Sequence, residues 1–427
     1  MNVADSYRVA SALENLGYTS TKLPEEADVI VLNTCMVRES AEQKAIGRLT
    51  TLKKLKSKDP APIISLMGCM VGIHDPVDLR KRYPYVDVFA QPSDPQPLID
   101  HIQGKTISVT QYRQVTDILE AQYPYTLPAS VSTTTVSAFL PIIYGCSHAC
   151  AYCIIPLRRG REISRAPQDI LNDARALVDR GVKEITLLGQ IVDRYGQDQP
   201  GYPTLDRLLR DLHQIDGLLR IRFLTSHPNW MTDAILEAVA ELPKVMPYIE
   251  LPNQSGDNTV LRNMRRGYTI EKYMHTIEKI RNKLEEVSIA TDIIVGFPGE
   301  TVEQFENTVQ SLRQLNPDMT HLARYSPRPG TYSAENIEDD VPPDEKMRRF
   351  RIIEKMQAEF STNINNQYLG RTVPILFEDK SKSRWRGRTP TNKIVFVEST
   401  RELRGELLDV KITWAGPWSM LGELIDQ

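Results

Sequence analysis

Several features that mark membrane, secreted and repeat proteins are missing from this sequence. It has no run of about 18 apolar residues, so we expect no membrane-spanning helix. Its first residues, 1–6, show no basic patch followed by an apolar run, so we expect no secretory signal. No repeat of about 20 to 50 residues is visible, which argues against a solenoid. A chain of 427 residues without these features is expected to form two or three domains.

Cysteine and basic charge are also scarce. Five cysteines, an odd number, do not indicate a disulfide framework in a chain of this length. They favour a reducing compartment in which thiols serve metals or chemistry, so the protein is expected in the cytoplasm. The net charge of −3 excludes a generally basic coat for nucleic acid. Any contact with RNA must therefore come from local basic patches.

Short apolar runs alternate with helical patterns in the first hundred residues. Such runs are typical of strands that a parallel sheet buries on both faces, and they predict an open α/β sheet over residues 1–103. Cys35 and Cys69 each follow one of the runs. Both are therefore expected at the carboxyl edge of the sheet, where ligands gather. The runs are residues 29–32, 63–66 and 86–89.

The rest of the α/β chain divides into three predicted parts. Residues 104–138, rich in Thr, Ser, Pro and Tyr, are expected to form a connector. Strands and amphipathic helices then alternate over 139–365 and predict a partial (β/α)6 barrel with its chemistry on the loops after the strands. Short strand-like runs predict a small β-barrel over 366–427. The predicted barrel strands are 139–144, 184–188, 220–225, 248–251, 288–296 and 319–325. The predicted helices are 167–180, 205–215, 232–242, 269–286, 300–315 and 344–366.

Three cysteines share one loop directly after the first predicted barrel strand. Cys146, Cys150 and Cys153 have the spacing C-x3-C-x2-C. Three thiolates can each bind one iron of a 4Fe-4S cubane and leave the fourth iron open to an external sulfonium compound. A structural zinc site needs four protein ligands, and His148 is poorly placed to be the fourth. Three inert, buried cysteines are a further alternative, but the Ser, His and Arg neighbours do not describe an apolar core. The spacing and position favour the cluster.

An ordered set of short motifs resembles the MiaB family of radical-SAM methylthiotransferases, the tRNA-2-methylthio-N6-dimethylallyladenosine synthases. Each motif alone is weak, but the ordered set is specific, and it covers essentially the whole chain except its start. The motifs include Asn-Thr-Cys at 33–35, Thr-Ser-His-Pro at 225–228 and Leu-Pro-Asn-Gln-Ser-Gly at 251–256. The others lie at 37–42, 146–165, 187–190, 265–268, 291–300 and 325–330.

The resemblance implies two 4Fe-4S clusters and two uses of S-adenosylmethionine. Cys146, Cys150 and Cys153 would hold the cluster that generates a 5′-deoxyadenosyl radical, which removes hydrogen from C2 of a modified adenine in tRNA. Cys35 and Cys69 would hold an auxiliary cluster whose sulfur accepts a methyl group. The alternative for the residues at 189, 190, 294 and 296 is that they form ordinary turns at strand ends. The implied cofactor-binding residues are Tyr152, Gly189, Gln190, Ile294 and Gly296.

The partners implied are tRNA, an electron donor such as flavodoxin or ferredoxin, and a sulfur donor; we expect a monomer. A basic run with one aromatic residue lies in the predicted C-terminal barrel, which resembles the RNA-binding TRAM domain. Basic side chains contact phosphates and an aromatic can stack on an unpaired base, although a solvated turn is the alternative. The predicted RNA-binding residues are Lys382, Arg384, Trp385, Arg386 and Arg388, with a second patch at Arg262, Arg265 and Arg266.

The start of the chain departs from the family pattern. Residues 1–6 match a family segment in which a cysteine precedes the position of Met1 by two residues and a strand comes before it. We therefore expect the natural protein to begin upstream. As written, the chain is expected to keep the radical cluster but to assemble the auxiliary cluster poorly, because two cysteines leave a cubane short of ligands.

Three alternatives stay open on the substrate and the class of protein. Relatives with the same chemistry act on N6-threonylcarbamoyladenosine in tRNA or on an aspartate of a ribosomal protein. The motifs at 37–39 and 161–165 favour the dimethylallyladenosine branch. A non-catalytic iron–sulfur or zinc protein that binds RNA is the alternative from another class, and metal analysis separates it from the enzyme.

Overall fold

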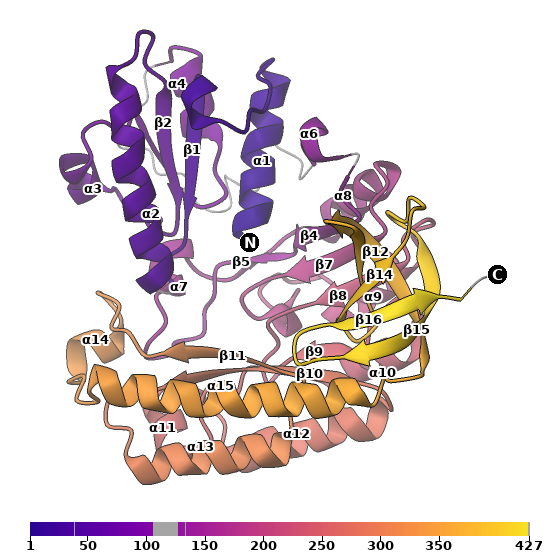
Figure 1. The fold of residues 1–427 in the computed structure, drawn as a ribbon. Helices are drawn as coiled ribbons and strands as arrows, with labels where there is room; N and C mark the ends of the chain where they lie inside the picture. The colour runs from indigo at the N-terminus through magenta and orange to yellow at the C-terminus, as the bar shows by residue number, and fades with distance from the viewer. Residues whose placement is uncertain (38, 106–126, 133, 426–427) are drawn as a thin grey trace.

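The computed structural model describes residues 1–427 except 38, 106–126, 133 and 426–427. In Figure 1 the N-terminal unit lies at the top, the strands and helices of the central unit lie below it, and the C-terminal barrel lies at the right. Most of the predicted connector lies outside the described residues, so the predicted domain boundaries stay predictions. Within the described part, no helix has both the length and the apolar character needed to cross a lipid bilayer.

The N-terminal unit contains the predicted parallel sheet, with strand order β1-β2-β3. The apolar side chains of β2 alternate between its faces: Leu66 packs in the same core as Leu49, whereas Met67 packs with Val9. Both faces are therefore covered. The strands are β1 (Val29–Thr34), β2 (Ile63–Gly68) and β3 (Val88–Ala90). The helices are α1 (Asn2–Asn15), α2 (Glu39–Leu52), α3 (Val77–Arg82) and α4 (Gln96–Ile102).

The six predicted strands of the central unit are confirmed in the described residues. They form two parallel three-stranded sheets, β4-β7-β8 and β11-β10-β9, which meet where β8 contacts β9. The strands are β4 (Ser137–Pro141), β7 (Glu184–Leu188), β8 (Arg220–Phe223), β9 (Tyr248–Glu250), β10 (Ser288–Val295) and β11 (Met319–Arg324). The predicted helices are also present: α8 (Pro167–Asp179), α9 (Leu205–His213), α10 (Asp233–Glu241), α12 (Ile270–Lys283), α13 (Val302–Leu315) and α15 (Pro343–Asn366).

The sequence patterns did not indicate several short elements of the central unit. The predicted strand 139–144 is divided, because β4 ends at Pro141 and a separate strand, β5 (Ile143–Tyr144), pairs antiparallel with β6 (Ile163–Ser164). This pairing closes the base of the cysteine loop. The other unpredicted elements are α6 (Ala129–Ser132), α7 (Ile155–Arg159), α11 (Asn258–Asn263) and α14 (Tyr332–Asn336).

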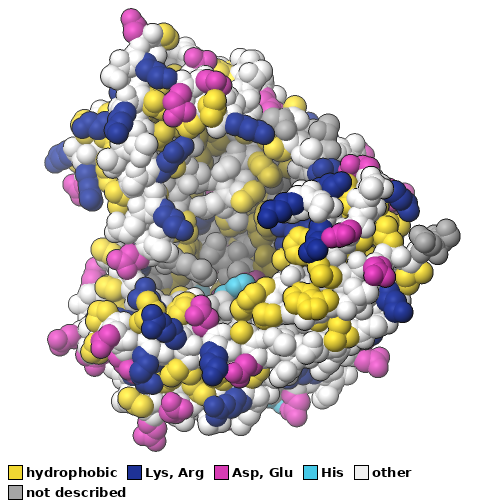
Figure 2. Space-filling model, viewed as in Figure 1, with side chains coloured by type: hydrophobic (Ala, Val, Ile, Leu, Met, Phe, Trp, Pro, Cys, Tyr) yellow, Lys and Arg dark blue, Asp and Glu magenta, His cyan; other side chains and the backbone are white. Residues whose placement is uncertain are grey.

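The C-terminal unit is the predicted small barrel. Its five strands close in the order β12-β13-β14-β16-β15 around a core that includes Phe377 and Trp385. Figure 2 shows a hollow on this face of the molecule, between the N-terminal unit, the central unit and this barrel. The strands are β12 (Thr372–Ser381), β13 (Arg384–Arg388), β14 (Ile394–Glu398), β15 (Leu407–Ala415) and β16 (Met420–Leu424).

Two buried arginines of β8 attach the C-terminal barrel to the central unit. Arg220 donates to the carbonyls of Arg388 (2.7 Å) and Pro374 (3.0 Å). Arg222 donates to the carbonyls of Pro390 (2.7 Å) and Thr389 (2.9 Å). The guanidinium of Arg222 also pairs with Glu184 at 3.1 Å. The barrel is thus held to the central unit through four of its backbone carbonyls.

We predict that Arg222→Ala lowers the free energy of unfolding by about 3–5 kcal/mol, because it leaves the buried carboxylate of Glu184 without its partner. Urea unfolding measures the change. Arg210→Ala is the control: its pair with Glu241 is exposed, and its loss should cost less than about 1 kcal/mol. Equal effects of the two substitutions would contradict the role given to Arg222.

Candidate metal centre and cofactor site

The cysteine loop leaves β5 through a glycine that no other residue can replace without strain. Gly145 has φ of 64°, and a Cβ built there would overlap the carbonyl oxygen of Arg161. The backbone N–H of Cys146 then donates to the carbonyl of Gly160 at 3.1 Å. The loop therefore starts and returns at fixed points, and it continues directly into α7.

The three thiols of the loop lie in a mostly buried setting with two N–H donors. The backbone N–H of His148 donates to Cys146 Sγ (3.4 Å), and Arg266 donates to Cys150 Sγ (3.1 Å). Burial raises the pKa of Cys146 to about 11 and that of Cys153 to about 12. Burial also acts to raise the pKa of Cys150, but the His148 side chain and the charge of Arg266 outweigh it and lower the pKa to about 7. A bound metal would stabilise all three thiolates.

The three cysteines of the loop are free thiols whose number suits the irons of a cubane. The ligands of a cubane bind different irons, so their sulfurs lie farther apart than the ligands of one ion. Three thiols on one short loop, with N–H donors directed at two of them, suit this arrangement.

Arg266 is predicted from the sequence to contact RNA, and its position corrects that prediction. Its residue is only 6% exposed, and its guanidinium donates to Cys150 Sγ and to Tyr268 Oη (3.1 Å). The side chain is therefore part of the packing beneath the cysteine loop and cannot meet a phosphate at the surface. Arg262 and Arg265 are exposed, and the guanidinium of Arg265 lies 3.5 Å from the ring centroid of Tyr332.

An aromatic group surrounds His227 beside the cysteine loop. The ring of His227 lies 4.5 Å from that of Trp230, 4.9 Å from that of His148 and 5.3 Å from that of Tyr268, measured between centroids. Trp230 also packs against Cys146 and Cys153 in one apolar cluster. Together these rings form an aromatic group beside the loop.

Several buried polar atoms without hydrogen-bond partners belong to residues for which we predicted no role from the sequence. In the described residues, six such atoms lie on the loops after β7, β8 and β9, which share one end of the barrel. Native proteins rarely leave buried polar atoms unpaired, so these atoms indicate a place for a polar ligand. Four of these atoms belong to residues of the motifs at 225–228 and 251–256, so the motifs were the available sequence signal for them. The atoms are Asp193 Oδ1, Ser226 Oγ, His227 Nε2, Asn229 Oδ1, Asn253 Oδ1 and Gln254 Oε1.

His227 and Gln254 have further features of a binding site. Burial lowers the pKa of His227 to about 2, so the ring is neutral. Its Nδ1 accepts from the backbone N–H of Asn229 at 3.2 Å, which leaves Nε2 as an N–H donor. Gln254 has φ of 77°, a conformation that a non-glycine residue adopts at a cost and that is common in functional sites.

The predicted cofactor-binding residues fall into two groups around the loop. Tyr152 and Ile294 pack in one cluster with Phe297. Gly189 follows β7, where a Cβ would meet Val192 Cγ1 at 3.2 Å, and Gln190 comes next and is half-buried. Their positions at the strand ends are as predicted, and contact with a cofactor stays a prediction.

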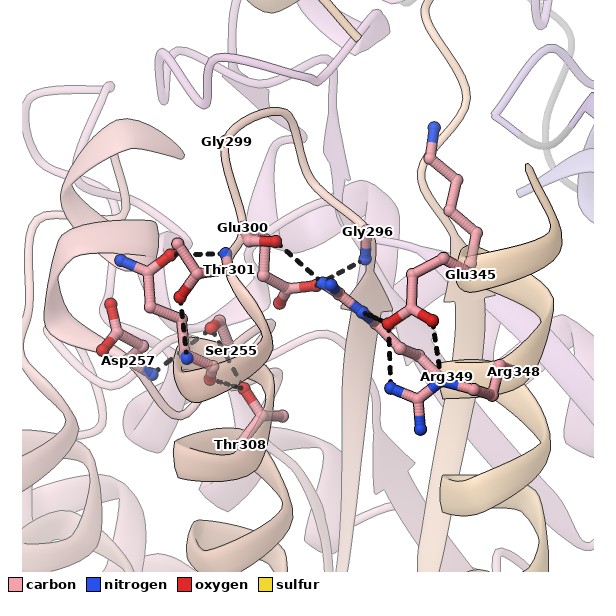
Figure 3. A network of polar contacts seen from close by, with 12 residues as sticks. Ser255, Asp257, Gly296, Gly299, Glu300, Thr301, Thr308, Glu345, Arg348 and Arg349 are labelled. Carbon is pink, nitrogen blue, oxygen red and sulfur yellow. Dashed lines mark hydrogen bonds and ion pairs between the residues drawn. The ribbon is translucent and has the colours of Figure 1, made fainter. Parts of the chain in front are cut away.

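Gly296 makes a different contact from the one expected. Its backbone N–H donates to Glu300 at 2.7 Å, and the same carboxylate oxygen pairs with Arg349 of α15 at 2.6 Å (Figure 3). A Cβ at Gly296 would also overlap the side chain of Lys346. This glycine therefore lets α15 pack against the end of β10, and its N–H is already used within the protein.

Cys35 and Cys69 lie at the ends of two paired strands. Thr34 of β1 is in register with Gly68 of β2, so the two cysteines follow equivalent positions at one sheet edge. The backbone N–H of Cys69 donates to the carbonyl of Thr34 at 3.1 Å. Arg159, at the end of α7, donates from Nε to Cys69 Sγ at 3.2 Å.

Arg159 and Arg8 connect the two groups of cysteines across the interface between the units. The guanidinium of Arg159 also pairs with Asp5 of α1 at 2.9 Å. Arg8, one turn farther along α1, donates to the hydroxyl of Tyr144 at 2.8 Å, two residues before Cys146. Both ends of the cysteine loop are thus attached to the helix that packs beside Cys69.

Comparison with known proteins agrees with this arrangement. Residues 1–91 match the uncharacterized protein family UPF0004, residues 140–312 the Radical SAM superfamily and residues 366–425 the TRAM domain. The tRNA-2-methylthio-N(6)-dimethylallyladenosine synthase of Roseiflexus sp. (strain RS-1) is 45% identical over 427 residues, 99% of this chain and 87% of the relative. The synthase of that name from Herpetosiphon aurantiacus is 44% identical over 430 residues, 100% of this chain and 95% of the relative.

The chain belongs to the tRNA-2-methylthio-N6-dimethylallyladenosine synthase family. Among solved structures, the radical S-adenosylmethionine methyltransferase TsrM from Kitasatospora setae has a similar fold, with a TM-score of 0.57. It is 12% identical, and the match covers 77% of this chain and 73% of that one. The family resemblance inferred from the motifs is therefore confirmed, as is the fold class.

The predicted basic strand of this family member is largely paired within the C-terminal barrel. Arg384 pairs with Glu398 at 2.9 Å, and the other two arginines of β13 pair with neighbouring carboxylates of β12. Such pairs, where they are exposed, contribute little to stability, so a phosphate could replace the carboxylate. Lys382 is exposed at the tip of the β12–β13 hairpin.

Trp385 requires a correction of its predicted role. It is 1% exposed and packs in the barrel core, with its indole N–H donated to the carbonyl of Arg401 at 2.8 Å. Neither face of this ring can accept a base. Trp385 alternates with basic residues because one face of β13 is buried and the other is not. Trp385 lies on the buried face.

We predict that Gly145→Ala strongly lowers iron and labile sulfide per chain after anaerobic reconstitution, because the loop cannot return to Gly160 past the added methyl group. The control is Gly181→Ala. That glycine has φ of 94° and open space around it, so the substitution brings backbone strain of about 1–2 kcal/mol but no overlap. Wild-type iron in Gly145→Ala would show that the loop geometry does not decide cluster binding.

Proposed function

We propose that this chain transfers a methylthio group to C2 of N6-dimethylallyladenosine in the anticodon loop of tRNA. It is a radical-SAM tRNA methylthiotransferase. The observation that carries the proposal is the three-cysteine loop at the mouth of a six-stranded partial barrel, in a chain 45% identical over its length to a synthase named for this product. The partners proposed are tRNA, an electron donor such as flavodoxin or ferredoxin, and a sulfur donor.

Cys146, Cys150 and Cys153 would hold the radical cluster. When bound, a 4Fe-4S cluster with one iron open to S-adenosylmethionine supplies the electron that cleaves a carbon–sulfur bond. Arg266 would stabilise the Cys150 thiolate by its N–H and its charge. The rings around His227 would keep water away from the reacting groups.

The unpaired polar atoms at the strand ends suit the polar groups of S-adenosylmethionine. That cofactor has an ammonium group, a carboxylate and two ribose hydroxyls. His227 Nε2–H is a donor for an oxygen, and the side-chain oxygens of Asn253 and Gln254 are acceptors. Tyr152 and Ile294 form an apolar surface on the other side of the loop, suited to the adenine ring.

Cys35 and Cys69 would supply thiolates to the auxiliary cluster. Such a cluster would supply the sulfur that is transferred. The N–H···S contact from Arg159 brings a positive charge to the buried sulfur of Cys69. The N-terminal unit would thus hold the sulfur source against the side of the barrel that holds the radical cluster.

We predict that Cys150→Ser abolishes formation of 5′-deoxyadenosine from S-adenosylmethionine, because one iron loses its ligand while the barrel core does not depend on the loop. Cys69→Ser is the matched control: it should keep this cleavage and lose methylthiolation. The assay is chromatography of products from anaerobically reconstituted protein. Cleavage at the wild-type rate by Cys150→Ser would refute the radical-cluster assignment, and zinc without labile sulfide in the wild type would support a non-catalytic binding protein.

The identity of the modified nucleoside is tested separately. We expect the enzyme to convert tRNA that carries N6-dimethylallyladenosine, because the chain matches synthases named for that product. Mass spectrometry of nucleosides after reaction with dimethylallylated and with threonylcarbamoylated tRNA measures the preference. Conversion of the threonylcarbamoylated tRNA alone would place the chain in the other branch.

A further inference from the structure

Two tryptophans on one hairpin of the C-terminal barrel are unusually exposed. Trp414 lies near the end of β15 and is 50% exposed, and Trp418 lies in the turn before β16 and is 53% exposed. The chain has four tryptophans, and Trp385 and Trp230 are instead enclosed by other residues. Large aromatic rings in water cost free energy that a monomeric protein normally avoids, so a pair of them suggests a binding surface.

The turn that carries these rings is fixed to the central unit. Gly416 N–H donates to the carbonyl of Ser419 at 3.0 Å, which closes the turn. Asn365, near the end of α15 and 5% exposed, donates to the carbonyl of Gly416 at 2.7 Å. The ring of Trp414 lies so close to Gly416 that a Cβ there would overlap it. The surface is therefore held in place before any ligand binds, which lowers the entropy lost on binding.

The hairpin lies at the edge of the hollow between the three units. Its turn points toward the gap above β9 and β10 in Figure 1. Figure 2 shows hydrophobic side chains over this hairpin and Lys and Arg side chains above them on the same face of the molecule. Lys411, three residues before Trp414, is also exposed. Exposed rings beside positive charge match a ligand with flat bases and phosphates.

We propose that Trp414 and Trp418 form a stacking surface for unpaired bases of the RNA substrate. This proposal rests on the proposed function and adds to it the residues that hold the RNA beside the reactive site. It also assigns the stacking role, expected of Trp385 from the sequence, to rings that are exposed. The basic residues of β13, which β12 and β14 separate from this hairpin in the barrel, would contact phosphates, and the tryptophans would bind bases farther along the RNA.

The test is the affinity of the reconstituted enzyme for an anticodon stem-loop RNA, measured over a series of salt concentrations. We expect Trp414→Ala with Trp418→Ala to weaken binding by about 5- to 150-fold for each base that loses its stacking partner. The slope against salt should not change, because stacking releases no counterions. Phenylalanine at both positions should restore most of the affinity, and a fully paired RNA duplex should bind the wild type and the alanine variant equally.

Two further variants separate this proposal from others. Alanine at Lys382, Arg384, Arg386 and Arg388 should weaken binding and flatten the salt slope, by about one unit for each lost phosphate contact. Leu407→Ala, 42% exposed at the other end of β15, should change neither quantity. If the double alanine variant keeps its fold by circular dichroism and binds the stem-loop as tightly as the wild type, the stacking surface does not exist. A wild type that binds the stem-loop but never methylthiolates it would count against the proposed function alone.

Discussion

The position of the cysteine loop relative to Cys69 depends on the contacts that the buried guanidinium of Arg159 makes. Arg159 lies six residues after Cys153 and reaches both Cys69 Sγ (3.2 Å) and the carboxylate of Asp5 (2.9 Å). Removal of such a cation leaves a buried carboxylate unpaired, at a cost of about 3–5 kcal/mol. Ile154, which follows Cys153 directly, packs in the same apolar core as Cys69. The end of the cysteine loop is therefore part of the N-terminal core as well as of the barrel.

A second ion pair holds the two units together at another point. Glu42 of α2 pairs with Arg328, on the loop after β11, at 2.6 Å, and the arginine is largely buried. One contact thus follows the first strand of the barrel and the other follows its last strand. The N-terminal unit is fixed across the open end of the strands, so a radical formed there would be enclosed by protein.

The features of the fold that depend on local sequence patterns could be predicted from the sequence. Apolar runs located the strands, and the parallel register then brought Cys35 and Cys69 to one edge because Thr34 pairs with Gly68. The sequence was insufficient wherever burial decides the role of a charged or aromatic residue. Arg266 and Trp385 look like surface residues in a basic pattern, yet tertiary packing buries both. The unpaired oxygen of Gln254 could not be predicted either, since only the fold shows which polar atoms lack a partner.

Strand β8 connects the C-terminal barrel with the cysteine loop. Its first residues, Arg220 and Arg222, hold backbone carbonyls of the C-terminal barrel, and its carboxyl end leads within four residues to His227 beside the cysteine loop. A strand inside a packed sheet has little freedom to move, because its neighbours fix it along its length. RNA held on the C-terminal barrel would therefore have a set distance to the cysteine loop. Selection of a target adenine would then depend on how many nucleotides separate it from the held bases, as well as on contacts to the adenine itself.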